Sequence, residues 1–142
     1  MPVNLSDLGL AKRTLSEEQL SLAVVKDGRI LFKSKSHGVS DLIGMIREIG
    51  QLAAGASLAD SIVGRAAALL CMYSKIASVY GVTMSEGAIP LFKASGVRFE
   101  YGDLVPKILN RDKSGMCPFE EAVLGVDSPS AALDKLSFLR FG

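Results

Sequence analysis

The sequence has no tryptophan, a single histidine and only two cysteines among its 142 residues. Zinc sites in proteins take three or four ligands, most of them Cys or His, so the chain is poorly supplied for such a site. Cys71 and Cys117 lie far apart and show no metal-type pairing, and so few cysteines favour a reducing compartment. We therefore expect a cytoplasmic protein with no metal and no cofactor.

An excess of charge of one sign is also missing, because 16 basic and 15 acidic residues leave a net charge of +1. A nucleic-acid-binding domain normally carries a basic patch, and a single-strand binder needs aromatic side chains, which reach only 6% here. Nucleic acid is therefore not an expected partner.

Long uninterrupted apolar runs are absent as well. Asp60 and Arg65 interrupt the longest candidate, so no transmembrane segment is expected. The first residues show no basic segment followed by an apolar one, and we expect no signal peptide. These absences exclude a membrane as an expected partner.

Apolar residues are abundant, at 49%, and the length suits one domain over residues 1–142 with a real core. The stretch from Ser57 to Tyr73 combines a polar entry with an apolar run of helical length. Residues in this stretch and just after it recur at the spacing of one buried helical face: Ala66, Leu69, Leu70, Tyr73 and Ala77. We predict a central helix that starts after Ser57 and runs to about Lys75.

The remaining elements alternate around this helix. Asp27-Gly28 is typical of a two-residue hairpin turn, because both positions tolerate positive φ. Strands are predicted over about 20–25, 29–34, 78–83, 97–101 and 105–109, the last at a sheet edge because of its proline. Helices are predicted over about 5–15, from 40 or 41 to 49, from 88 or 89 to 96, and from starts at 117–118 and 127–129. This order predicts an α/β fold with a mixed sheet covered by helices on both faces.

The order of elements and several local motifs resemble an uncharacterised domain-of-unknown-function family with a cytidine-deaminase-like fold. The motifs span most of the chain: Val24–Gly28, Asp60 with Gly64–Leu70, Ser85-Glu86, Leu104–Pro106, Asn110–Asp112 and Gly115–Pro118. The resemblance implies a three-layer α/β/α sandwich whose mixed five-stranded sheet has the order 2-1-3-4-5. It implies no established activity.

The resemblance also locates a zinc site that this chain does not supply. Cytidine-deaminase-like enzymes place His-x-Glu or Cys-x-Glu at the start of the central helix and Pro-Cys-x-x-Cys at the next helix start, to bind zinc and move a proton. Here those positions correspond to Gly64-Arg65-Ala66 and Met84-Ser85-Glu86-Gly87. Neither offers a thiolate or an imidazole, so zinc-dependent deamination is not expected.

The start of the central helix is nevertheless the candidate binding site, because backbone N–H groups there attract anions. Arg65 could bind a phosphate or carboxylate beside them, or be an ordinary solvated arginine. Asp60 could cap the helix, or present a functional carboxylate to the same cleft as Ser85. The sequence alone leaves these alternatives open.

The segment before the last helices is predicted to form another wall of the ligand-binding site. Asn110 and Arg111 could close over an anionic ligand or form a solvated connector, and the resemblance includes both. Cys117, just before Pro118, could be a nucleophile or a helix cap. A nucleophile needs a base, and no pattern places His37 near it.

These observations predict a cytoplasmic protein with a cytidine-deaminase-like fold that lacks the zinc site and binds a small anionic ligand, with nucleotide-like molecules among the candidates. The predicted ligand-binding residues are Asp60, Gly64, Arg65, Ser85, Asn110 and Arg111. One alternative is a non-catalytic oligomeric interaction module, since the apolar composition is compatible with a homo-oligomer. Another is a zinc-independent hydrolase or transferase that uses Cys117.

Overall fold

The computed structural model describes residues 6–36, 38–110 and 112–141. The strands are β1 (Leu22–Lys26), β2 (Arg29–Ser34), β3 (Ser57–Val63), β4 (Ser78–Ser85) and β5 (Arg98–Val105). The α-helices are α1 (Asp7–Glu17), α2 (Val39–Ile49), α3 (Arg65–Tyr73), α4 (Ile89–Ser95), α5 (Pro118–Ala122) and α6 (Pro129–Phe141). Short 3-10 helices, η1 (Gly50–Ala53) and η2 (Glu86–Ala88), follow α2 and precede α4.

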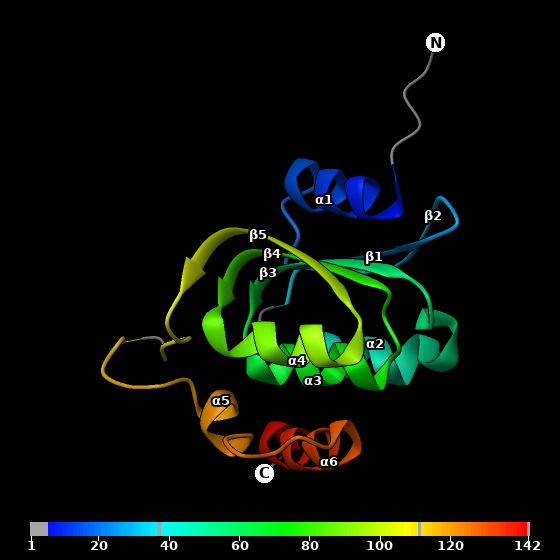
Figure 1. The fold of residues 1–142 in the computed structure, drawn as a ribbon. Coiled ribbons are helices and arrows are strands. Elements are labelled where there is room, and N and C mark those ends of the chain that lie inside the picture. The colour runs from blue at the N-terminus through cyan, green and yellow to red at the C-terminus, as the bar shows by residue number, and fades with distance from the viewer. Residues whose placement is uncertain (1–5, 37, 111, 142) are drawn as a thin grey trace.

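The sheet has the order β2-β1-β3-β4-β5, which confirms the order implied by the resemblance. β1 pairs antiparallel with β2 and β3, whereas β3, β4 and β5 run parallel. α1 covers one face of the sheet and α2, α3 and α4 cover the other (Figure 1). α5 and α6 pack outside this second helical layer, so α3 lies between the sheet and α6.

The predicted hairpin between β1 and β2 is confirmed. Asp27 and Gly28 adopt φ values of 52° and 76°, the two positive values that this turn requires. The carboxylate of Asp7, in the first turn of α1, accepts hydrogen bonds from both of their N–H groups at 2.9 Å. The turn is therefore fixed to α1 as well as to its own strands.

The predicted start of the central helix was wrong, because Ser57–Val63 forms β3 and the helix begins only at Arg65. β3 lies in the middle of the sheet, and its first four residues are buried. A strand buried on both faces lacks polar alternation, and its sequence cannot be distinguished by periodicity from a buried helix. The sheet thus includes residues 58–63, which the pattern had assigned to the helix.

The end of the sheet also differs from the prediction. The two predicted strands over 97–101 and 105–109 are replaced by the single strand β5. Gly102, which falls in the gap between the two predicted strands, stays in the strand beside β4. A Cβ atom at this position would lie 2.7 Å from the carbonyl oxygen of Val82, so the missing side chain permits this close pairing. The strand ends at Val105, just before Pro106.

The helix boundaries are mostly close to those predicted. α1 begins at Asp7 with Ser6 as its N-cap, and α2 begins at Val39. Gly96 follows α4 with a φ of 76°, as expected for a left-handed C-terminal residue. Among the described residues, no helix combines the length and the apolar character needed to cross a membrane.

The main core lies between the sheet and the layer of α2, α3 and α4. α3 is buried on both sides because α6 covers its outer surface, and its buried residues are Ala66, Ala67, Ala68, Leu69, Leu70 and Cys71. Cys71 is fully buried within this core. Tyr73, predicted to lie on the buried face, is 42% exposed.

Leu69→Ala should lower the free energy of unfolding by about 2–5 kcal/mol, because it opens a cavity in the close-packed core around α3. Leu69 is fully buried, and Leu52, which is 66% exposed, provides a matched control. Leu52→Ala should cost less than about 1 kcal/mol. Urea denaturation measures both, and equal losses would contradict this description of the core.

Candidate functional site

A cavity of about 610 Å³ lies beside the start of α3. The start of α2, the end of β3, the first turn of α3 and the segment between β5 and α5 surround it. Its lining residues are Gly38, Val39, Leu42, Asp60, Ile62, Gly64, Ala66, Ala67, Ile108, Leu109, Asn110, Asp112, Cys117, Pro118, Phe119 and Glu120. Most of these residues are apolar, and a few polar groups converge among them, as is typical of small-molecule sites.

Asp60 is the more deeply buried of two buried acids in the described lining of this cavity, the other being Glu120. It is only 5% exposed, and its Oδ1 accepts a hydrogen bond from the N–H of Ile62 at 3.3 Å. Burial, reinforced by the nearby charge of Asp41, raises the pKa of Asp60 from 3.8 to about 8. Because Asp60 belongs to β3, it caps no helix, and the capping role considered from the sequence was wrong.

Asp41 brings a second buried acid to the start of α2. It is 3% exposed, and its carboxylate accepts a hydrogen bond from the hydroxyl of Ser34 at 2.7 Å. The hydroxyl of Ser21 contacts the other carboxylate oxygen. These contacts tie the first turn of α2 to the β1–β2 hairpin and hold a negative charge close enough to disfavour ionisation of Asp60.

Glu120 binds the start of α3. Its carboxylate, supplied by α5, accepts hydrogen bonds from the N–H groups of Arg65 at 2.8 Å and Ala66 at 2.7 Å. Such charge-assisted bonds satisfy N–H groups that have no partner within the helix. Gly64 makes the approach possible, because a Cβ atom there would lie 2.1 Å from Oε1 of Glu120. The anion that we expected at this helix start is thus a carboxylate of the chain itself.

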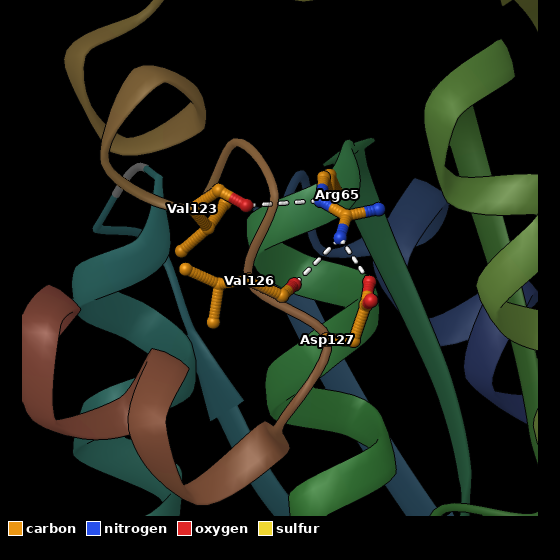
Figure 2. Close-up of polar contacts among 4 residues, drawn as sticks. All are labelled: Arg65, Val123, Val126 and Asp127. Carbon is orange, nitrogen blue, oxygen red and sulfur yellow. Dashed lines mark hydrogen bonds and ion pairs between the residues drawn. The ribbon is translucent and has the colours of Figure 1, made fainter.

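Whereas the N–H of Arg65 binds Glu120, its side chain binds the segment after α5 (Figure 2). Its Nε donates to the carbonyl oxygen of Val123 at 3.0 Å, and one terminal nitrogen donates to the carbonyl oxygen of Val126. The same nitrogen forms an ion pair with Asp127 at 2.7 Å. Arg65 is only partly exposed, its guanidinium is bound within the chain, and it does not line the cavity, so it fits neither the freely solvated arginine nor the ligand-binding residue considered from the sequence.

The segment between β5 and α5 closes on itself beside the cavity. Asn110 and Gly115 are joined through their main chains, and the N–H of Cys117 donates to the carbonyl oxygen of Ile108 at 3.0 Å. The side-chain oxygen of Asn110 also accepts from the N–H of Ser114 at 3.0 Å. Cys117 is partly buried and is the N-cap residue of α5, in agreement with the predicted helix start.

The structure brings some of the predicted site residues together and separates others. Asp60, Gly64, Asn110 and Cys117 line the cavity. Arg65 does not, and neither does Ser85, which is buried at the end of β4. Arg111, like His37, lies outside the described residues.

Sequence reasoning missed the role of Glu120. The only hint was an acidic residue in the first turn after Pro118, a pattern that normally indicates stabilisation of its own helix. The contact with α3 joins residues 54 and 55 positions apart, so no local pattern could indicate it.

The residues that the resemblance assigns to the positions of the deaminase zinc ligands do not fit zinc. Gly64-Arg65-Ala66 lie at the start of α3, and Met84-Ser85-Glu86-Gly87 run from the end of β4 into η2. None of these residues supplies an imidazole or a thiolate. Across the described residues, no group of three or more His, Cys, Asp or Glu side chains is arranged to hold a metal ion.

The sheet order and covering helices define an α/β sandwich with a cytidine-deaminase-like fold. RibD from Acinetobacter baumannii shares this fold with a TM-score of 0.51 at 14% identity, over 68% of this chain and 35% of the RibD chain. The chain belongs to the family described as domain of unknown function DUF1893, whose model matches residues 10–139.

A DUF1893 family protein from Thermotoga maritima, known from a crystal structure, is similar over nearly the whole length of both chains. The alignment covers 99% of this chain and 93% of that one, with 28% identity and a TM-score of 0.85. No curated protein matches this chain.

Glu120→Gln should lower the free energy of unfolding by about 1–3 kcal/mol, because an amide can offer only one acceptor oxygen to two N–H groups. Glu121→Gln is a matched control, since Glu121 is the exposed neighbour on the same helix. It should change stability by less than about 0.5 kcal/mol. Urea denaturation measures the free energy of unfolding of both variants. Equal losses of stability would show that this contact is not important.

Gly64→Ala provides an independent check on the same contact, because its methyl group would displace the carboxylate of Glu120. Once that carboxylate has been displaced, replacing Glu120 should cost less. The double variant should therefore lose less stability than the sum of the two single variants.

Asp60→Asn should flatten the dependence of stability on pH. The raised pKa means that the folded protein retains a proton that the unfolded chain has already lost, so the wild type loses stability as the pH rises from 3.8 to about 8. Near pH 8 the variant should be more stable than the wild type, by a few kcal/mol at most. Asp103→Asn, on the exposed side of β5, should retain the wild-type pH dependence. Thermal melts across this range measure the effect.

Proposed function

We propose that this protein binds a small organic molecule in the cavity beside the start of α3. The observation that supports this most strongly is a cavity of about 610 Å³ with an apolar lining and a buried acid, Asp60, at its wall. Small-molecule sites typically occupy about 300–1,000 Å³ and place a few polar groups within apolar walls. A buried acid with a shifted pKa is a feature of such sites more often than of ordinary cores.

The ligand that suits this cavity is mostly apolar and carries no negative charge at its buried end. The sequence had suggested an anionic, nucleotide-like ligand bound at the helix start, but Glu120 already accepts hydrogen bonds from the N–H groups there. Among the described lining residues, every charged side chain is acidic: Asp60, Asp112 and Glu120. A phosphate in this cavity would meet carboxylates, whereas an uncharged or positively charged ligand would not be repelled.

Asp60 and Gly64 form the inner part of the proposed site, and Asn110 and Cys117 form its outer wall. A cytoplasmic location remains a prediction from the sequence. Self-association and a reaction at Cys117 are alternatives that no contact among the described residues favours over ligand binding.

A library of small organic fragments tests the proposal through Cys117. In the folded protein Cys71 is fully buried, so iodoacetamide should alkylate Cys117 first. A fragment bound in the cavity should slow the alkylation of Cys117, measured by mass spectrometry, and should raise the melting temperature. A library in which no fragment protects Cys117 would contradict the proposed function.

Two variants locate the bound fragment. Ala67→Phe should fill the cavity from α3, and Ile62→Trp should narrow it from a residue that is 50% exposed and therefore tolerant of substitution. Both should abolish protection of Cys117. Ala131→Phe, at an exposed position on α6, is the matched control and should leave protection unchanged. Protection that survives both cavity variants would place the fragment elsewhere.

A further inference from the structure

The charge of the cavity indicates what kind of ligand it takes. Asp60 is almost completely buried on β3, and its hydrogen bonds come from its own strand, from Ser61 and Ile62. Among the described residues, no Lys or Arg side chain lines the cavity. Asp60 therefore has no basic partner within the described lining. It lies beside an apolar space that is large enough for an organic molecule.

The other acidic groups around Asp60 make the cavity more negative, which favours binding of a positively charged group. Asp41 faces it from α2 and adds negative charge. The thiol of Cys71 lies near it on α3, but burial raises the pKa of this thiol, so it stays uncharged. Glu120 on α5 and Asp112 in the preceding loop contribute two more carboxylates to the cavity lining. Hydrogen bonds from Ser114 lower the pKa of Asp112, which keeps its charge negative at neutral pH.

We infer that the cavity takes a small organic cation, with an ammonium or amidinium group placed against the carboxylate of Asp60 and an apolar body against the surrounding walls. This inference rests on the proposed function and specifies its ligand class. A buried carboxylate gains a charge-assisted hydrogen bond from such a group, and the apolar lining gains buried contact with its body.

Binding of a cation should release a proton from Asp60 to the solvent. Burial holds the pKa of Asp60 at about 8, so at neutral pH the empty site contains mostly the protonated acid. A cation binds the ionised form better, and its affinity should therefore rise with pH until Asp60 is ionised without it. The affinity of an uncharged ligand of the same shape should not rise in this way.

Three flat probes of nearly equal shape separate these cases: benzamidine is a cation, benzamide is neutral and benzoate is an anion. The dissociation constant of benzamidine, measured by calorimetry, should be at least about tenfold lower at about pH 9 than at about pH 6. Over the same range benzamide should change little, and benzoate should bind most weakly. Protection of Cys117 from iodoacetamide, expressed at each pH as the ratio of rates with and without probe, should follow the same order.

Asp60→Asn tests whether this acid is the group that titrates. The variant should bind benzamidine more weakly at the higher pH and should lose the pH dependence, while its melt confirms that it is folded. Asp103→Asn, on the exposed side of β5, should bind benzamidine as the wild type does.

Several outcomes would overturn the inference. Equal, pH-independent binding of benzamidine and benzamide, with Cys117 protected, would remove the cation requirement and leave the proposed small-molecule site intact. Tighter binding of benzoate would replace the cation by an anion. A pH dependence that persists in Asp60→Asn would assign it to another group. If benzamidine fails to bind while other fragments protect Cys117, the inferred class is wrong, whereas failure of all fragments would overturn the proposed site as well.

Discussion

The candidate site depends on a pair of contacts that join the start of α3 to α5 and to the residues just after α5. Glu120 binds the first N–H groups of α3, and Arg65 binds the carbonyl groups that follow α5. A helix start favours negative charge and a carbonyl oxygen favours an arginine, so each partner meets the group it prefers. These contacts hold α5 at the outer wall of the cavity. They also position the residues that precede α6, the helix that covers α3.

The contact with Glu120 also explains why the start of α3 is not open to the anionic ligand predicted from the sequence. Its N–H groups are satisfied within the chain, and the absent side chain of Gly64 is the condition for that arrangement. The group most suited to bind a ligand is instead Asp60, on the strand that directly precedes α3, where burial holds the pKa of the acid at about 8. Such a group opposes folding when it ionises, and proteins retain that kind of cost most often at functional sites.

Local features of the fold could be predicted from the sequence because neighbouring residues decide them. The hairpin turn at Asp27-Gly28 and the helix end at Gly96 follow from backbone conformations that few residues adopt. Predictions failed where burial overrides local pattern. Ser57–Val63 has the composition of a buried segment of either type, and only its place between β1 and β4 makes it a strand.

The sequence by itself determined the β1–β2 hairpin, most helix positions, the burial of α3, the family resemblance and the lack of imidazole and thiolate at the positions that the resemblance assigns to the deaminase zinc ligands, but it missed β3 and divided β5. It also identified Asp60, Gly64, Asn110 and Cys117 as candidates for one site, and these residues do line one cavity. The tertiary structure alone decided that Arg65 turns away from that cavity and that Glu120 takes the helix start. The physical reason is distance along the chain, because contacts between residues more than fifty positions apart leave no periodic trace in the sequence.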